Sequence, residues 1–117
     1  MKQRDDTYLL DMLLAARRVR AYMEGVDRER LEADAVLQDA VAHRLQILGQ
    51  AASRVSPSTR ESHPGLPWRE MTGLRNRIVH EYSRVDLDII WEVVQGDLAP
   101  VIADLEGIVP PEGSTPP

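Results

Sequence analysis

The spacing of apolar residues is the feature of this chain that most restricts its fold. Near the start they recur every three or four positions, the repeat of one face of an α-helix, and predict a helix from Asp5 to Glu24. The same repeat predicts a second helix from Asp34 to Val55, which the Ser56-Pro57 pair would end. The sequence shows no alternating pattern of the kind that indicates a β-strand. We therefore expect an all-α protein.

A third helix is predicted to begin at Pro67. Proline suits the first position of a helix because its missing N–H would have no partner there. Apolar residues at helical spacing continue from Trp68 to Ile78, so we expect the helix to end near His80 or Tyr82.

A fourth helix is predicted after Asp86, a residue that suits the positively polarised start of a helix. Its apolar pattern runs to Leu105 and includes Pro100, which predicts a kink or a break near Leu98. The predicted helices indicate an all-α up-and-down bundle.

Length and composition are those of one ordinary globular domain. We expect residues 1–108 to form the helical domain and residues 109–117, which include four prolines, to form a disordered tail. No apolar run reaches the roughly 18 residues that a membrane span needs, and the first residues lack the apolar core of a secretion signal. The expected location is the cytoplasm, without membrane association. Cysteine is absent, which excludes disulfides and thiolate metal sites.

Charge is unevenly distributed. The net charge of -5 argues against a broadly basic nucleic-acid-binding surface. Between residues 69 and 84, however, four arginines and two glutamates give a local charge of +2, so the other residues sum to -7. The sequence therefore predicts a focused basic site on an acidic protein, which can still attract a polyanion.

The most chemically informative segment lies within this basic stretch. Arg75, Asn76, His80 and Tyr82 fall within eight residues of a chain that is otherwise poor in histidine and aromatic residues. An arginine can hold a phosphodiester, and a histidine can move a proton near neutral pH. On a helix, Asn76 and His80 would share a face, so that the amide could orient the imidazole or a ligand.

Each of these residues also has an ordinary structural interpretation. Arg77 could pair with Glu81 four positions later, His80 could stabilise a helix C-terminus, and Tyr82 could be a boundary aromatic. Arg75 and His80 would lie about 140° apart around a helix, too far round to act together within one chain. A homodimer with two such helices antiparallel would bring two arginines and two histidines into one cleft. There, two imidazoles could act as base and acid on an RNA 2′-hydroxyl and the leaving 5′-oxygen.

Metal and cofactor chemistry is not indicated. The three histidines, His43, His63 and His80, are far apart in sequence and match no metal-binding spacing. Glycine-rich phosphate loops, nucleophilic-serine motifs and cysteine nucleophiles are absent from the sequence. We expect neither a bound metal nor a cofactor.

The run from Arg75 to Tyr82 resembles the R-x4-H-x-Y signature of HepT-like proteins of the HEPN superfamily. The tryptophan-containing flanks Pro67–Met71 and Val85–Glu92 match in register, and Ala42–Ala52 looks like the second long helix of the family. The resemblance covers residues 6–105. It implies a four- to five-helix bundle that dimerises through the helix carrying the motif. It also implies a metal-independent endoribonuclease that is the toxin of a type VII toxin–antitoxin pair.

The resemblance also assigns roles to individual residues. It implies Arg75 and His80 as the active-site pair, with Asn76 as a polar support. The partner implied is a MntA-like nucleotidyltransferase antitoxin, which would transfer AMP from ATP onto Tyr82 and thereby silence the enzyme. Arg77 and Arg84 are further candidate RNA-binding cations.

Two departures from the family pattern are visible. Gln50 stands where many relatives have glutamate, and Ser83-Arg84 replaces a more usual aromatic–glycine pair. The alternative function is a non-catalytic dimer that binds nucleotide or RNA and acts only with its nucleotidyltransferase. A purely structural helical dimer would leave the clustering of Arg, Asn, His and Tyr unexplained.

Overall fold

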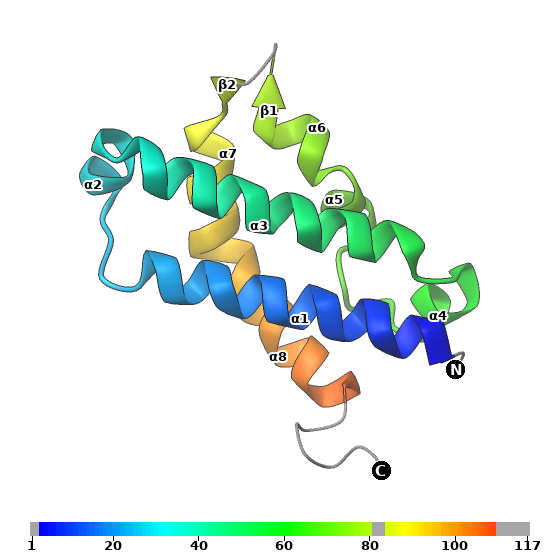
Figure 1. Ribbon diagram of the computed structural model, residues 1–117. Coiled ribbons are helices and arrows are strands. Elements are labelled where there is room, and N and C mark those ends of the chain that lie inside the picture. The colour runs from blue at the N-terminus through cyan, green and yellow to red at the C-terminus, as the bar shows by residue number, and fades with distance from the viewer. Residues whose placement is uncertain (1–2, 81–83, 110–117) are drawn as a thin grey trace.

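Two long helices, α1 (Gln3–Met23) and α3 (Ala35–Arg54), form the frame of the molecule. The computed structural model describes residues 3–80 and 84–109, and in it these helices lie side by side and antiparallel (Figure 1). Both follow the predicted helices closely, so the apolar repeat identified them correctly. A short helix, α2 (Arg28–Ala33), connects them after Gly25, whose φ of 72° ends α1 in a conformation that glycine adopts readily.

The core lies between α1, α3 and the C-terminal helices. Figure 1 shows the C-terminal segment crossing behind the α1–α3 pair. Burial of each large apolar side chain contributes about 1.5–3 kcal/mol, which makes this interior the main source of stability. The largest side chains that are almost completely buried are Leu9, Met12, Leu31, Leu45, Ile78, Ile90, Ile102 and Leu105.

The N-terminal turn of α1 is tied to α4 (Pro57–Ser62) by a buried carboxylate. Asp5 is 3% exposed and accepts hydrogen bonds from the backbone N–H of Ser56 at 3.0 Å and from its hydroxyl at 2.6 Å. The hydroxyl of Thr59 also donates to Asp5, at 2.6 Å. A buried carboxylate needs such partners, so this cluster fixes the end of α3 against the start of α1.

The predicted third helix is two short helices, α5 (Trp68–Thr72) and α6 (Leu74–Ile78), joined at Gly73. After Ile78 the chain becomes extended and forms β1 (Val79–His80), which pairs antiparallel with β2 (Arg84–Val85). The expectation of a helix continuing to His80 or Tyr82 was therefore wrong. β-branched residues at 78, 79 and 85 favour the extended pairing over a further helical turn.

The predicted fourth helix is also divided. It consists of α7 (Leu87–Glu92), the π-helical segment η1 (Val93–Asp97) and α8 (Leu98–Ile108). Pro100 falls in the first turn of α8, where a missing N–H costs little. The irregularity predicted near Leu98 is present as a π-helical segment, but the backbone stays helical at both of its junctions, so the helix is not broken there.

Helices dominate the described residues, which confirms the all-α class apart from the two-residue strands. Val109 still packs into the core, while residues 110–117, most of the predicted tail, lie outside the described part. Within residues 3–80 and 84–109, no helix is both long and apolar enough to cross a lipid bilayer.

Candidate active site

A polar groove of about 360 Å³ runs between α3 and the α5–α6 pair. Arg75 from α6 and Thr72 from α5 form one wall. None of the described residues that line it is acidic, so no carboxylate of the lining competes for the exposed guanidinium of Arg75. Such a lining suits an anion or the polar edge of a nucleobase. The α3 wall is made by His43, Gln46, Ile47, Gly49, Gln50 and Ser53.

Gly49 sets the width of this groove. A Cβ at this position would lie 2.7 Å from the backbone oxygen of Met71, which is too close for any side chain. Glycine therefore allows α5 to pack directly against α3. Trp68 secures the same helix, since its indole N–H donates to the backbone oxygen of His63 at 2.9 Å. Together these contacts fix the position from which α6 presents Arg75.

His80 is presented by a strand and not by a helix. Its backbone pairs with Arg84 across the two-stranded ribbon, and Val79 pairs with Val85. The predicted helical face shared by Asn76 and His80 does not exist, because the helix ends at Ile78. The helical angle predicted between Arg75 and His80 fails for the same reason. The side chains of His80 and Arg84 lie outside the described atoms.

The base of the ribbon is held by backbone and capping bonds. The N–H of Asp86 donates to the backbone oxygen of Ile78 at 2.6 Å, which closes the ribbon. The carboxylate of Asp86 accepts from the N–H of Ile89 at 3.2 Å and caps α7. These bonds couple the end of α6 to the start of α7.

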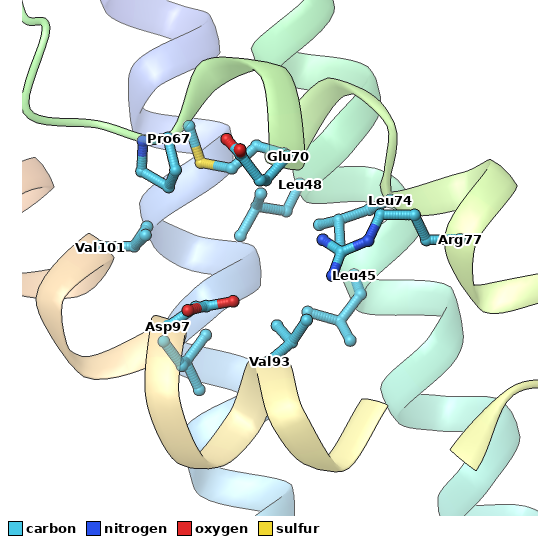
Figure 2. Close-up of a pocket in the computed structure, with 11 residues that line it drawn as sticks. Leu45, Leu48, Pro67, Glu70, Leu74, Arg77, Val93, Asp97 and Val101 are labelled. Atoms are coloured by element: carbon cyan, nitrogen blue, oxygen red, sulfur yellow. The ribbon is translucent and has the colours of Figure 1, made fainter. Parts of the chain in front are cut away.

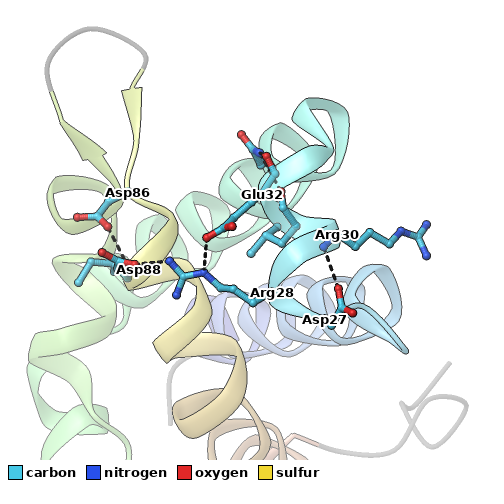
Figure 3. Close-up of polar contacts among 9 residues, drawn as sticks. Asp27, Arg28, Arg30, Glu32, Asp86 and Asp88 are labelled. Atoms are coloured by element: carbon cyan, nitrogen blue, oxygen red, sulfur yellow. Dashed lines mark hydrogen bonds and ion pairs between the residues drawn. The ribbon is translucent and has the colours of Figure 1, made fainter.

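Arg28 connects this region to α2. Its guanidinium bonds to Asp88 at the start of α7 and to Glu32 at 3.1 Å, as Figure 3 shows. The carboxylate of Asp88 is the largest cause of the raised pKa of Arg28. The ribbon carrying His80 is therefore anchored on both of its sides, through α6 and through α7.

The two arginines of α6 lie on different sides of that helix. Arg77 is half-buried and lines a small pocket of about 20 Å³, with Glu70 and Asp97 on its rim (Figure 2). That volume holds about one water molecule and no larger ligand. Residues two apart on a helix point in nearly opposite directions, so Arg77 is separated from the groove of Arg75. Asn76 is exposed between them.

One predicted site residue lies outside the described part of the chain, and two residues that were not predicted as site residues line the Arg75 groove. Tyr82 belongs to residues 81–83, which connect the strands and lie outside the described residues. His43 and Gln50, not singled out as site residues from the sequence, both line the Arg75 groove. They are seven positions apart on α3 and so share a face. The seven-residue spacing could have indicated that His43 and Gln50 share a surface. Ordinary solvent-exposed faces of helices show the same spacing, so it does not by itself identify a functional site.

Comparison with known proteins identifies the family. The sequence profile described as "Ribonuclease HepT-like" matches residues 12–108. A Methanocaldococcus jannaschii protein named as a candidate RNase is 31% identical over 107 residues, covering 91% of this chain and 98% of the relative. A Thermococcus cleftensis protein named as a probable ribonuclease HepT is 31% identical over 98 residues, covering 84% and 89%. No solved structure is significantly similar to the chain. A profile match over most of the length, with relatives aligned nearly end to end, shows that this chain belongs to the HepT-like ribonuclease family.

Proposed function

We propose that this protein is a metal-independent endoribonuclease that uses Arg75 and His80. The observation that carries the proposal is the acid-free groove beside Arg75 in a chain of the HepT-like family. A guanidinium in such a groove can hold a phosphodiester without competition from a neighbouring carboxylate. His80 follows α6 by two residues, on a ribbon anchored to that helix.

The proposed reaction is an internal transphosphorylation of RNA. One imidazole removes the proton of a 2′-hydroxyl, and the 2′-oxygen attacks the adjacent phosphorus. The 5′-oxygen leaves with a proton from a second imidazole, which gives a cyclic phosphate and a new 5′-hydroxyl. Arg75 stabilises the charge that develops on the phosphoryl oxygens, so neither a metal nor a cofactor takes part.

A homodimer supplies the second imidazole in this proposal. One chain contains a single His80, whereas the reaction needs a base and an acid. A two-fold dimer formed around the α6–ribbon region would place both copies of Arg75 and His80 in one composite cleft.

The first experiment measures RNA cleavage in the presence of EDTA. Purified wild type, His80→Ala and Arg75→Ala are compared, with Arg30→Ala as a control for the loss of one exposed arginine outside the groove. We expect each site substitution to lower the cleavage rate at least 100-fold, because general acid–base catalysis alone contributes about 10²–10⁴-fold. Circular dichroism verifies that every variant is folded. Equal rates in folded wild type and His80→Ala would contradict the proposal.

A mixing experiment tests the composite cleft. Wild type and His80→Ala proteins are unfolded together in varied proportions, refolded and assayed, beside each protein refolded alone. Mixed dimers would hold one histidine in the shared cleft, where the reaction needs two, so we expect them to be inactive and the cleavage rate to fall with the square of the wild-type fraction. A rate that falls in direct proportion to the wild-type fraction, with mixed dimers demonstrated by native mass spectrometry, would place each site within a single chain.

We further propose that the enzyme is a cytoplasmic toxin of a type VII toxin–antitoxin pair. Its partner would be a MntA-like nucleotidyltransferase that attaches AMP to Tyr82. Each AMP would add negative charge and bulk two residues from His80, which would obstruct the cleft and oppose RNA binding. Support for this regulation is the H-x-Y spacing of the sequence.

Intact-mass spectrometry tests the regulation. The protein is incubated with ATP and the nucleotidyltransferase encoded beside it, and Tyr82→Phe and Tyr8→Phe serve as the test and control variants. We expect AMP addition and loss of RNA cleavage in wild type and Tyr8→Phe only. An AMP adduct that persists in Tyr82→Phe would reject Tyr82 as the acceptor.

A non-catalytic binding module is the second candidate, because the net charge of -5 is unusual for a protein that must capture RNA. It predicts nucleotide or RNA binding by the wild type with no cleavage in any variant. The cleavage assay distinguishes this binding module from the proposed endoribonuclease.

A further inference from the structure

A second groove, of about 390 Å³, lies on the opposite side of the exposed ridge of α3. It separates α1 from α3, whereas the Arg75 groove separates α3 from α5 and α6. Ile47 lines both grooves. The two depressions therefore adjoin each other across one half-exposed side chain. The second groove is lined by Asp11, Leu14, Ala15, Arg17, Arg18, Ala21, Arg44 and Ile47.

Two guanidinium groups in this groove have no carboxylate partner. Among the described residues, neither Arg18 from α1 nor Arg44 from α3 forms an ion pair. Arg17, by contrast, is paired with Glu106 at 2.8 Å. The one acid of the lining, Asp11, is two helical turns before Arg18, roughly 10 Å along α1. In a protein of net charge -5, two unpaired cations in one groove concentrate positive charge that can attract an anion.

Arg18 and Arg44 line the same groove from two different helices. Tyr22 follows Arg18 by four positions on α1, so the two residues share a face of that helix. The pKa of the Tyr22 hydroxyl lies below its ordinary value, chiefly because of Arg44 and also because of Arg18. A phosphate placed there would accept hydrogen bonds from both guanidinium groups and from the neutral phenol.

The same groove offers apolar surface. Leu14 is 39% exposed, and Ile47, which lines the same groove, is half-exposed. Apolar side chains next to paired guanidinium groups fit a ligand that alternates anionic and flat apolar parts. A single-stranded nucleic acid has that alternation, because its phosphates and bases repeat along the strand.

We propose that Arg18, Arg44 and Tyr22 form a phosphate-binding subsite for single-stranded RNA, and that the strand crosses α3 over Ile47 between this subsite and Arg75. This inference rests on the proposed function, because it takes RNA as the ligand of the Arg75 groove. It extends that function by assigning a second contact region, outside the motif, which would hold nucleotides flanking the cleaved bond. The subsite is a positioning element and takes no part in the chemistry.

A second copy of this chain is the competing occupant of the α1–α3 face. Two copies related by a two-fold axis would bring the same unpaired arginines toward each other, with only Asp11 from each copy to offset them. The charge pattern therefore favours a polyanion over self-association.

The test measures binding without cleavage. The ligand is a fluorescent oligonucleotide of about ten nucleotides in which every 2′-hydroxyl is methylated, so that it cannot be cut. Fluorescence anisotropy compares wild type, the double variant Arg18→Ala/Arg44→Ala, the matched double control Arg4→Ala/Arg30→Ala and the charge-retaining Arg18→Lys/Arg44→Lys. The control removes two exposed arginines that line neither groove.

We expect the Kd of Arg18→Ala/Arg44→Ala to rise about tenfold or more, while the matched control changes less than about twofold. The slope of log Kd against log salt should fall by roughly 1.4 in the same variant, since each phosphate contact in a single strand contributes about 0.7. The lysine variant should recover most of that slope, because it keeps the charge but not the paired geometry. A dinucleotide with the same 2′-methylation should have the same Kd for wild type and for Arg18→Ala/Arg44→Ala.

Two results would overturn the inference. One is an unchanged Kd and salt slope in Arg18→Ala/Arg44→Ala, with wild-type binding intact. The other is a change of oligomeric state in that variant by analytical ultracentrifugation, which would make this face a subunit interface. Because the ligand cannot be cleaved, failure of the proposed ribonuclease activity, which the cleavage assay tests separately, would not alter either result, whereas failure of wild type to bind would reject the phosphate subsite.

Discussion

The α1–α3 frame and the motif segment, residues 67–86, are built in different ways. The frame consists of two helices of 21 and 20 residues whose buried faces are continuous apolar stripes. The motif segment contains two five-residue helices and a two-stranded ribbon, held by glycine packing, a cap and backbone bonds. Short elements of this kind have little stability of their own.

Because of this difference, stability and function depend on different parts of this small domain. The frame supplies both walls of the groove between α1 and α3 and one wall of the Arg75 groove, while the motif segment adds Arg75 and the backbone of His80. A rigid apolar frame can tolerate a weakly stable active segment docked on it. Substitutions in the frame should therefore change global stability most, and substitutions in the motif segment should change activity out of proportion to stability.

The largest effect on stability is expected for Leu45→Ala in the frame. Leu45 is 0% exposed at the centre of α3, so the lost burial and the resulting cavity should cost about 2–5 kcal/mol. Urea unfolding at one fixed protein concentration measures the change, because association would otherwise alter the apparent stability. A loss well below 1 kcal/mol would show that the frame does not dominate the stability of the domain.

Gly49→Ala tests the contact between the two regions. The new methyl group would displace Met71 and with it α5, at a cost of about 1–3 kcal/mol. Because α5 leads into α6, RNA cleavage should fall more than unfolding at the assay temperature explains. Gly107→Ala, in open space on α8, is the matched control and should leave both properties nearly unchanged. Equal RNA cleavage by Gly49→Ala and Gly107→Ala would show that the packing of α5 against α3 does not affect catalysis.

Asp86→Ala tests the capping of the motif segment. Loss of the carboxylate that accepts from Ile89 should cost about 0.5–2 kcal/mol. Amide hydrogen exchange should accelerate most at the start of α7 and in the ribbon, with little change in α1. Uniform acceleration across α1 and α7 would indicate that both regions unfold as one unit.

The smallest effect concerns Tyr22 on the frame. Arg44 and Arg18 lower its pKa from 10.0, so its tyrosinate should form at a lower pH than in the unfolded chain. The stabilisation from this group is therefore present above the unfolded pKa and is lost as the pH falls through the lower folded value. Ultraviolet titration of wild type minus Tyr22→Phe isolates the transition. Its midpoint should rise in Arg44→Ala, and an unchanged midpoint would remove the support that Tyr22 gives to the phosphate subsite.

Sequence patterns were sufficient for the frame. Apolar repeats over twenty residues identified α1 and α3, and Pro100 indicated the irregularity that precedes α8. They were insufficient for the motif segment, where a helix was predicted through His80 and the structure has a ribbon. A stretch of five residues holds too few helical repeats to distinguish a helix from a turn or a strand, so tertiary contacts decide its conformation.

The sequence by itself determined the helical class of this protein and the local presence of Arg75, His80 and Tyr82, because periodicity and residue identity are properties of the chain alone. Only the tertiary structure decided which side chains share a surface. It brought His43 and Gln50 to Arg75, turned Arg77 away, and gathered Arg18, Arg44 and Tyr22 from two helices. The physical reason is that contacts between elements depend on how helices pack, down to the single close approach at Gly49.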